Sequence, residues 1–329
     1  MKRIVLVTDT CRPDVNGVAT TIANYAREIP SLGYELTVVG PEGLPSLSCP
    51  MSRDVRLAYD LQFERSMFDG LVAVHIATEG TLGVMARSFC LRNGIKFTTS
   101  YLTMFPEYLK AHLGVPLFLT KAYLSWFHGR SSAVMCCTRH LAESLSWIKA
   151  PKKICPKAVD AASFRYEGSG RSGDKVALYV GRVSREKNLE AFCRLLMPAR
   201  KVVVGDGPQL EEYRRSFPDV QFVGAVDHGS LPEYYGRADV FVFPSKTDTY
   251  GLVMLEALAC GTPVAAYPVN GAMDLADNHT VFVDEDLDVA VTSALHHADY
   301  SRCRSRADGR TWEESATRLC SNLVFQRVQ

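Results

Sequence analysis

The chain has 329 residues, of which 47% are hydrophobic and 22% are charged, and its formal net charge is +1. This length allows two α/β domains with full hydrophobic cores, and the composition is that of a soluble globular protein. No run of about 18 apolar residues occurs, so we expect no membrane-spanning segment.

Cysteine usage and the distribution of charge narrow the class of protein further. Ten cysteines are scattered without a C-x-x-C pair, which indicates buried thiols in a cytoplasmic protein rather than a zinc site or a disulfide framework. Residues 1–160 carry 18 Lys and Arg against 13 Asp and Glu, a net +5, and the remainder carries 19 against 23, a net −4. The basic half is compatible with an acidic acceptor or a membrane surface, but selects neither.

The first half reads as strands alternating with helices. Apolar runs bounded by turn residues predict strands at 4–7, 35–39, 71–76, 96–101, 132–137 and 153–156. Helices are expected at 18–29, at 82–92 and from about residue 140, whereas residues 41–70 read as irregular. The opening run is a first strand and not a signal peptide, because it is short and Asp9 follows it.

The loop between the first strand and the first helix is a candidate ligand loop. It is too long for a simple turn, and Asn16 and Gly17 stand where the helix begins. Loops at the carboxyl ends of parallel strands are where open α/β sheets bind ligands. The loop lacks G-x-G-x-x-G, which disfavours a dinucleotide site.

The second half begins again after a Gly- and Ser-rich stretch at 165–175 that reads as a linker. Strands are predicted at 176–180, 201–204, 221–223, 240–243, 264–269 and 281–283, with helices at 209–217, 231–237, 252–260, 287–297 and 312–325. Arg182 and Lys187 are five residues apart in the loop after the first of these strands. Such a pair can bind one pyrophosphate, although a solvated basic loop is the alternative.

The turn after strand 240–243 holds the densest set of candidate residues. It opens a helix near Leu252, so the amides around Gly251, Leu252 and Val253 form an anion site at a helix N-terminus. Glu256 lies one turn into the helix, and Asp248 precedes it by eight residues in the loop. Two carboxylates beside an anion site suit a nucleotide sugar, while turn glycines and a solvated glutamate are the alternative.

The segment Asp248-Thr-Tyr-Gly-Leu-Val-Met-Leu-Glu256-Ala, followed by Gly261-Thr-Pro-Val264, resembles the signature of the family-4 retaining glycosyltransferases. The first acidic residue is Asp rather than the usual Glu, as in the mannosyl- and sulfoquinovosyl-transferase-like branch. Gly181-Arg182 with Glu186-Lys187-Asn188 also matches the family. The resemblance covers nearly the whole chain and is strongest over residues 176–271.

The resemblance implies a GT-B fold, in which two Rossmann-like parallel-sheet α/β domains face one cleft. We expect an acceptor-side domain at 1–164, a linker at 165–175 and a donor domain at 176–310. A C-terminal helix at about 311–329 is expected to pack back on the first domain.

The resemblance also implies transfer of a sugar from a UDP- or GDP-sugar to an acceptor hydroxyl, with retention and without a metal or other cofactor. In the catalytic group, Asp248 would hold sugar hydroxyls, and Arg182 and Lys187 would neutralise the diphosphate. The expected nucleotide-sugar contacts are Glu256 (ribose), Gly251, Leu252 and Val253 (diphosphate), Asn16 and Gly17 (donor phosphates), and Gly205 and Val223 (base). The expected acceptor-side residues are Glu79, Tyr101 and Leu102, with Glu79 pointing into the cleft and His75 structural.

The chain departs from the family at Ser100-Tyr101-Leu102-Thr103-Met104, where relatives carry a His and an Arg at the third and fifth positions. The absent His would contact the C6 hydroxyl of the sugar, so Leu102 favours a pentose or a 6-deoxy donor. The same departure motivates an alternative, a degenerate member that binds a nucleotide or partner without turnover. An epimerase or hydrolase is less favoured, because the extra acid/base groups it needs are not found.

The acceptor stays open. A lipid, a glycan, a small metabolite or a modified nucleic acid base is compatible with the sequence. We expect a cytoplasmic protein, with peripheral contact to the inner membrane surface left open.

Overall fold

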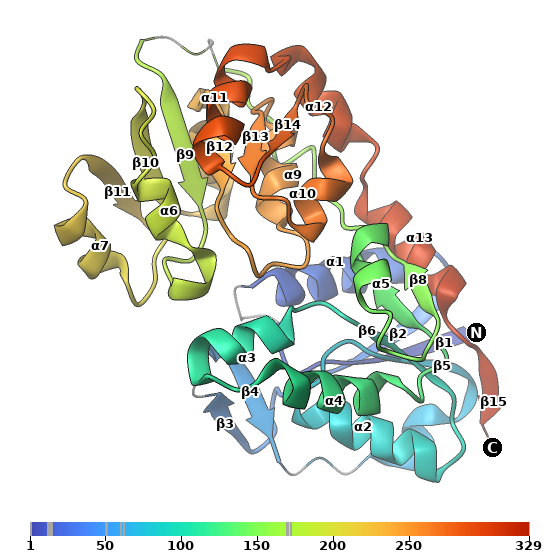
Figure 1. The fold of residues 1–329 in the computed structure, drawn as a ribbon. Helices are drawn as coiled ribbons and strands as arrows, with labels where there is room; N and C mark the ends of the chain where they lie inside the picture. Colours follow the sequence, from blue (N-terminus) through green and yellow to red (C-terminus); the bar gives the residue numbers. More distant parts are fainter. Residues whose placement is uncertain are drawn as a thin grey trace. The chain divides into compact units, whose positions relative to one another are not determined.

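The computed structural model describes residues 2–11, 16–49, 52–59, 61, 63–168, 171 and 173–328. Part of the first candidate loop (12–15) and part of the expected linker (169, 170 and 172) lie outside the described residues. The chain forms two compact α/β units, unit 1 (Met1–Pro156 with Trp312–Gln329) and unit 2 (Lys157–Thr311), whose elements are drawn in Figure 1.

Unit 1 is built on a seven-stranded sheet with the order β2-β1-β5-β6-β7-β8, in which all these neighbours are parallel. The strands are β1 (Lys2–Val7), β2 (Tyr34–Val39), β5 (Gly70–Ile76), β6 (Phe97–Ser100), β7 (Val134–Cys136) and β8 (Lys152–Ile154). The seventh, β15 (Gln326–Val328), comes from the end of the chain and pairs antiparallel with β5. The strands are apolar runs because helices cover parallel sheets on both faces.

The helices of unit 1 are α1 (Gly17–Ser31), α2 (Thr81–Arg92), α3 (Phe105–Leu113), α4 (Leu117–His128), α5 (Arg139–Ser144) and α13 (Trp312–Asn322). Helix α13 packs against α1. The fully buried Tyr25 hydroxyl on α1 lies 3.1 Å from both Cys155 Sγ and Ser315 Oγ, which ties the C-terminal helix to the sheet.

The expectation of irregular structure over residues 41–70 is wrong. Strands β3 (Ser46–Cys49) and β4 (Ser52–Ala58) pair antiparallel, and a 3-10 turn η1 (Arg65–Phe68) buries Phe68 in the core. The prolines suggested irregularity, but Leu47 and Leu57 occupy a period-two apolar pattern and face each other in register. Proline outside the paired positions does not prevent a short hairpin.

Unit 2 contains a six-stranded, all-parallel sheet with the order β11-β10-β9-β12-β13-β14. The strands are β9 (Val176–Val180), β10 (Arg200–Val204), β11 (Val220–Gly224), β12 (Val240–Phe243), β13 (Val264–Ala266) and β14 (Val281–Val283). The chain builds outward from β9 in one direction and then returns to add β12 on its other side. The strand order therefore reverses between β9 and β12, the point where such sheets bind ligands.

The helical segments of unit 2 are η2 (Arg185–Lys187), α6 (Leu189–Cys193), α7 (Leu210–Ser216), η3 (His228–Ser230), α8 (Leu231–Arg237), α9 (Leu252–Ala259), α10 (Asn270–Leu275), α11 (Leu287–His297) and α12 (Tyr300–Asp308). The strand expected at 264–269 is shorter than predicted, because Pro268 interrupts it and α10 follows at once. Helix α12 was not predicted, since it is strongly polar and buries only Cys303 and Ala307, one turn apart.

Unit 2 begins at Lys157, upstream of the expected boundary at 164. Phe164 is buried and packs its ring against His228 and Tyr235. Arg171, within the expected linker, donates to the carbonyls of Ala238 and Gly261. Arg171 thus packs on unit 2. Within the described part of the chain, no helix is long and apolar enough to cross a membrane.

Candidate functional site

Two loops of unit 2 meet at the point where the strand order reverses. One follows β9 and covers residues 181–188; the other follows β12 and covers residues 244–251. Asn188 Nδ2 donates to the Pro244 carbonyl at 3.1 Å, and Thr247 Oγ1 donates to the Glu186 carbonyl at 3.0 Å. These cross-loop bonds hold the predicted basic pair and the predicted acidic loop beside each other.

Lys187 and Asp248 form an ion pair between these loops. The Lys187 ammonium lies 2.7 and 2.9 Å from the two Asp248 oxygens, and both side chains are about three-quarters buried. Burial alone would raise the pKa of Asp248, but the charge and hydrogen bonds of Lys187, with a hydrogen bond from Ser245, hold that pKa below its ordinary value. Asp248 is therefore ionised and can accept hydrogen bonds, next to a cation that the ion pair holds in place.

The N-terminus of α9 has no side-chain cap in the described part of the chain. Its cap residue, Gly251, has a φ of 85° and no side chain to bond the first amides of the helix. A Cβ at this position would lie 2.6 Å from the Phe243 ring, so the glycine is needed for both its conformation and the space it leaves. The amides of Leu252 and Val253 follow directly, as the sequence predicted for a phosphate site.

Glu256 lies one turn into α9 and is held by a tyrosine that the sequence analysis did not single out. The fully buried Tyr235 on α8 donates its hydroxyl to Glu256 Oε2 at 2.9 Å. Burial raises the pKa of Glu256 from 4.5 to about 7, and the hydrogen bond from Tyr235 opposes that rise. The protonation state of this carboxyl is therefore balanced near neutral pH, which is common for groups at functional sites.

The remaining predicted residues of unit 2 surround the same edge of the sheet. Gly205 has a φ of 138°, and a Cβ there would lie 1.9 Å from the Gly181 carbonyl oxygen. The absence of a side chain at Gly205 therefore lets the loops after β9 and β10 approach each other. The Arg182 carbonyl accepts from Tyr179 at 2.8 Å, which anchors its loop. Val223 is half-buried near the end of β11.

In unit 1, Asn16 caps α1. Its Oδ1 accepts from the amides of Val18 and Ala19 at 3.0 and 2.8 Å, and its Nδ2 donates to Thr10. A Cβ at Gly17 would meet no described atom within 4 Å, so packing does not require glycine there. The capping role is sufficient to account for Asn16, and a phosphate contact by this loop stays a prediction.

Asp9 joins the loops after β1 and β5, where the strand order of the first sheet reverses. Its carboxylate is buried and accepts from Thr78 Oγ1 at 2.6 Å and from the amides of Gly80 and Leu82 at 3.0 and 2.8 Å. Burial raises the pKa of Asp9, although these hydrogen bonds oppose the rise. Asp9 fixes the turn that carries Glu79.

The Glu79 side chain is directed into unit 1, contrary to the expectation that it points into a cleft. It is only 6% exposed, and its Oε1 lies 3.3 Å from His128 Nε2, while His128 Nδ1 lies 2.9 Å from Thr99 Oγ1. Neither Glu79 Oε1 nor His128 Nε2 makes a hydrogen bond within the described residues, so His128 on α4 is a close polar neighbour of the buried carboxylate. This placement indicates that Glu79 positions its loop.

The other acceptor-side residues and His75 are also accounted for. Tyr101 is buried with its ring 6.0 Å from that of His128, and Leu102 is half-buried immediately after β6. His75 lies between the hydroxyls of Thr98 and Ser100, each at 2.9 Å, and burial lowers its pKa to about 3. The ring is neutral and structural, as expected.

Tyr235, His128 and Asp9 are the residues that sequence reasoning missed. Tyr235 lies in a predicted helix of mixed composition, and His128 ends an apolar helical stretch. Neither position carries a local signal, because the role of each depends on a partner far along the chain.

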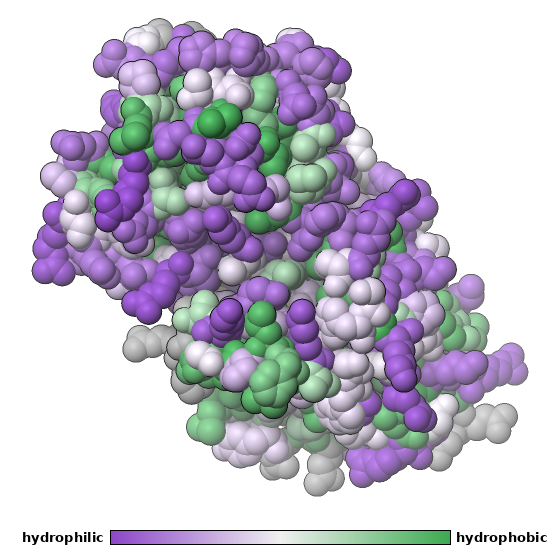
Figure 2. Space-filling model, viewed as in Figure 1, coloured by the Kyte–Doolittle hydropathy of each residue, from purple (hydrophilic) through white to green (hydrophobic). Residues whose placement is uncertain are grey.

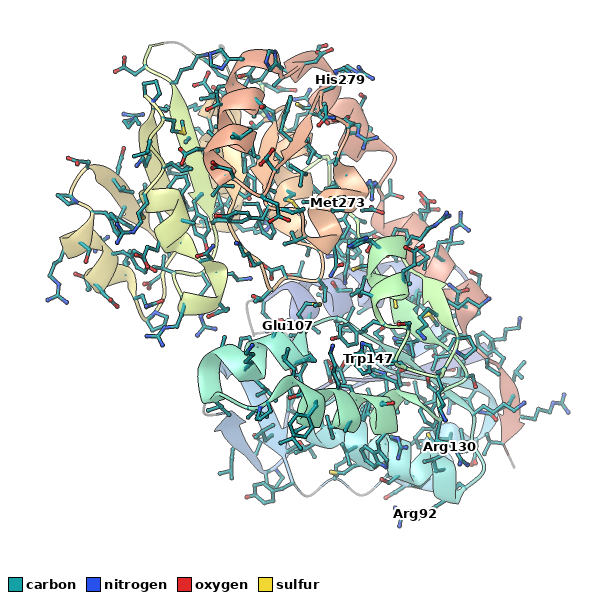
Figure 3. All side chains as sticks on the ribbon, in the orientation of Figure 1. Arg92, Glu107, Arg130, Trp147, Met273 and His279 are labelled. Carbon is teal, nitrogen blue, oxygen red and sulfur yellow. The ribbon has the colours of Figure 1, made fainter. Side chains whose placement is uncertain are left out.

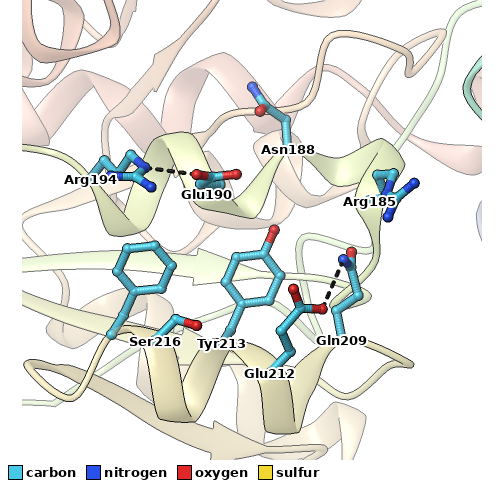
Figure 4. Close-up of a pocket in the computed structure, with 9 residues that line it drawn as sticks. Arg185, Asn188, Glu190, Arg194, Gln209, Glu212, Tyr213 and Ser216 are labelled. Atoms are coloured by element: carbon cyan, nitrogen blue, oxygen red, sulfur yellow. Dashed lines mark hydrogen bonds and ion pairs between the residues drawn. The ribbon is translucent and has the colours of Figure 1, made fainter.

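A polar hollow between α6 and α7 is drawn in Figure 4. Its charged and polar groups largely pair with one another: Arg194 Nε lies 2.8 Å from Glu190, and Gln209 donates to Glu212. In the described ranges, no group of three or more His, Cys, Asp or Glu side chains is placed to hold a metal ion. The loops around Lys187 and Glu256 are thus the stronger candidate site.

Two family models match the chain in succession. A model described as Glycosyltransferase Family 4 matches residues 15–162, and a model described as Glycosyl transferases group 1 matches residues 174–297. The alpha-monoglucosyldiacylglycerol synthase of Streptococcus pneumoniae is 27% identical, over 89% of this chain and 78% of its own length. A GDP-mannose-dependent alpha-mannosyltransferase of Mycobacterium tuberculosis is also 27% identical, over 84% and 82%.

Solved structures show the same fold. The sucrose-phosphate synthase of Thermosynechococcus elongatus superposes with a TM-score of 0.77 at 18% identity, over 98% of both chains. Anabaena HepE in complex with UDP-glucose gives a TM-score of 0.68 at 14% identity, over 98% of this chain and all of the other. The predicted fold class, a GT-B arrangement of two Rossmann-like parallel-sheet domains, is confirmed.

Proposed function

The chain belongs to the family-4 glycosyltransferases, enzymes that use nucleotide-sugar donors, and we propose that it transfers its sugar with retention of anomeric configuration and without a metal ion. The observation that carries this proposal is the cluster at the reversal point of the unit 2 sheet. There Lys187, Asp248 and the N-terminus of α9 lie on two loops that are bonded to each other.

Each group of this cluster matches one part of a nucleotide sugar. Lys187 and Arg182 would bind the diphosphate together with the amides at the start of α9. Asp248, kept ionised by Lys187, would accept hydrogen bonds from sugar hydroxyls. Glu256 would accept hydrogen bonds from the ribose hydroxyls, with Tyr235 fixing its orientation. The positive charge of Lys187, Arg182 and the helix N-terminus would stabilise the diphosphate as it leaves.

Retention follows if the acceptor attacks from the side on which the diphosphate departs. As the bond between the anomeric carbon and the diphosphate oxygen breaks, the acceptor oxygen bonds to the same face of that carbon. The proton of the acceptor hydroxyl passes to the departing diphosphate. No protein nucleophile is assigned in this scheme.

We propose a UDP- or GDP-sugar as the donor, in line with the ligands and names of the relatives. Leu102 supports a pentose or 6-deoxy sugar, because an apolar residue would leave a C6 hydroxyl without a hydrogen-bond partner. Leu102→His should shift the ranking of donors toward hexoses. An unchanged ranking would exclude this part of the proposal.

A calorimetric panel of UDP, GDP, ADP and dTDP tests the donor site. We expect micromolar binding of one nucleotide to wild type and loss of that binding in Glu256→Ala. If no nucleotide binds, the transferase proposal fails. Binding without turnover across donors and acceptors would instead support a degenerate member, and release of free sugar without an acceptor would indicate a hydrolase.

A further inference from the structure

Helix α4 presents an apolar stripe to solvent. Phe118 and Leu119 are 69% and 51% exposed, Trp126 is 48% exposed, and Ala122 between them is exposed as well. Their spacing of three, four and seven residues places them on one face of the helix. Leu113, at the end of α3, is 60% exposed. We call Leu113 and these four residues the α3–α4 stripe.

The opposite face of α4 already forms the core. Thr120, Leu124, Phe127 and His128 are buried. Arg87 on α2 donates to the carbonyls of Trp126 and Phe127 and stacks on the Trp126 ring at 4.0 Å, which fixes the end of the helix. Trp126 is therefore fixed in place by α2, and the stripe is a second apolar face of α4 beside the face that packs on the core. Figure 2 shows hydrophobic side chains gathered over α3 and α4.

Cations outnumber acidic residues in the segment 105–130 that carries the stripe. Lys110 on α3 and Arg130 after α4 are exposed, and half-buried Lys121 lies over the Trp147 ring at 5.8 Å. Arg130 and Trp147 are labelled in Figure 3. Glu107 is the one acidic residue in 105–130 and is only partly exposed, with a buried oxygen. A contiguous apolar surface edged by cations is complementary to an anionic amphipathic surface.

We propose that the α3–α4 stripe docks this protein on an anionic lipid bilayer. Phe118 and Leu119 would enter the acyl boundary, Trp126 would lie at the level of the headgroups, and Lys110, Lys121 and Arg130 would contact lipid phosphates. A second copy of the chain is the weaker occupant. A two-fold contact through this face would set the same cations against one another. This inference is independent of the donor and of turnover.

Vesicle flotation with the 329-residue chain tests the proposal without any nucleotide. Wild type is compared on phosphatidylglycerol vesicles and on phosphatidylcholine vesicles, with Phe118→Asp/Leu119→Asp as the test variant. Leu196→Asp is the matched control, because Leu196 is 90% exposed in unit 2 and outside the stripe. Circular dichroism melts of all three proteins check that the exposed substitutions leave the fold intact.

We expect wild type and Leu196→Asp to float with phosphatidylglycerol, and the double variant to bind at least about tenfold more weakly. Binding should also fall as salt is raised and should be weak on phosphatidylcholine. Equal binding by the double variant and the control would overturn the proposal. A lack of vesicle binding would also overturn it, including the case in which wild type sediments as a dimer and the double variant as a monomer.

Discussion

Replacing Tyr235 with phenylalanine removes one hydroxyl and keeps a ring that is fully buried. That hydroxyl donates to Glu256 Oε2 at 2.9 Å. A hydrogen bond to a charged group contributes about 1.5–3 kcal/mol. Since one pKa unit corresponds to about 1.4 kcal/mol, its loss should raise the pKa of Glu256 by about one to two units, from a value of about 7 in the native chain.

The pH dependence of nucleotide affinity reports this change. If ionised Glu256 accepts from the ribose hydroxyls, affinity measured by calorimetry falls as pH drops through the pKa of Glu256. The midpoint should lie near pH 7 in wild type and about one unit or more higher in Tyr235→Phe. The two proteins should bind equally well at high pH, where both carboxyls are ionised.

A 2′,3′-dideoxynucleoside diphosphate is the control ligand, because it lacks the hydroxyls that Glu256 would bind. Its affinity should not respond to Tyr235→Phe. The reasoning is refuted if wild type and variant show the same midpoint with the ribonucleotide. It is also refuted if the dideoxy ligand shows the same shift as the ribonucleotide.

Three further predictions concern the same unit. The pKa of Glu256 is raised from 4.5 to about 7 in the folded chain, so the contribution of its protonated carboxyl to folding stability is present below pH 4.5 and is lost as pH rises through 7. In urea unfolding, the free energy of unfolding of Glu256→Gln relative to wild type should therefore rise by about 3 kcal/mol between acidic and mildly basic pH. Lys187→Ala should weaken nucleoside-diphosphate binding about tenfold to hundredfold, whereas Lys246→Ala, in the neighbouring loop after β12 and stacked on Tyr267, should change calorimetric affinity little. Gly205→Ala places a Cβ 1.9 Å from the Gly181 carbonyl and should lower the free energy of unfolding by more than about 2 kcal/mol, while Gly17→Ala, with no described atom within 4 Å, should not lower it.

The strands were largely predictable because parallel strands covered on both faces are continuous apolar runs. Val176–Val180 and Val240–Phe243 lie where the runs predicted them. Prediction from apolar runs failed for elements whose sequence is more polar or more proline-rich than their packed structure suggests. The hairpin at Ser46–Ala58 is short, with Pro45 before it and Pro50 between its strands, and the polar helix Tyr300–Asp308 has only two buried side chains.

The sequence by itself determined which residues stand at the carboxyl ends of strands, and so it identified Lys187, Asp248 and Glu256 as candidates. Only the tertiary structure decided what those residues contact. Lys187 and Asp248 are 61 residues apart, with β10 and β11 between them in the chain, and they pair at 2.7 Å because β12 returns to lie beside β9. Glu79 likewise turns inward, where His128, on a helix distant in sequence, lies 3.3 Å from its carboxylate. Periodicity and turn chemistry act over a few residues, whereas strand order and the direction of a buried side chain are set by packing across the whole unit.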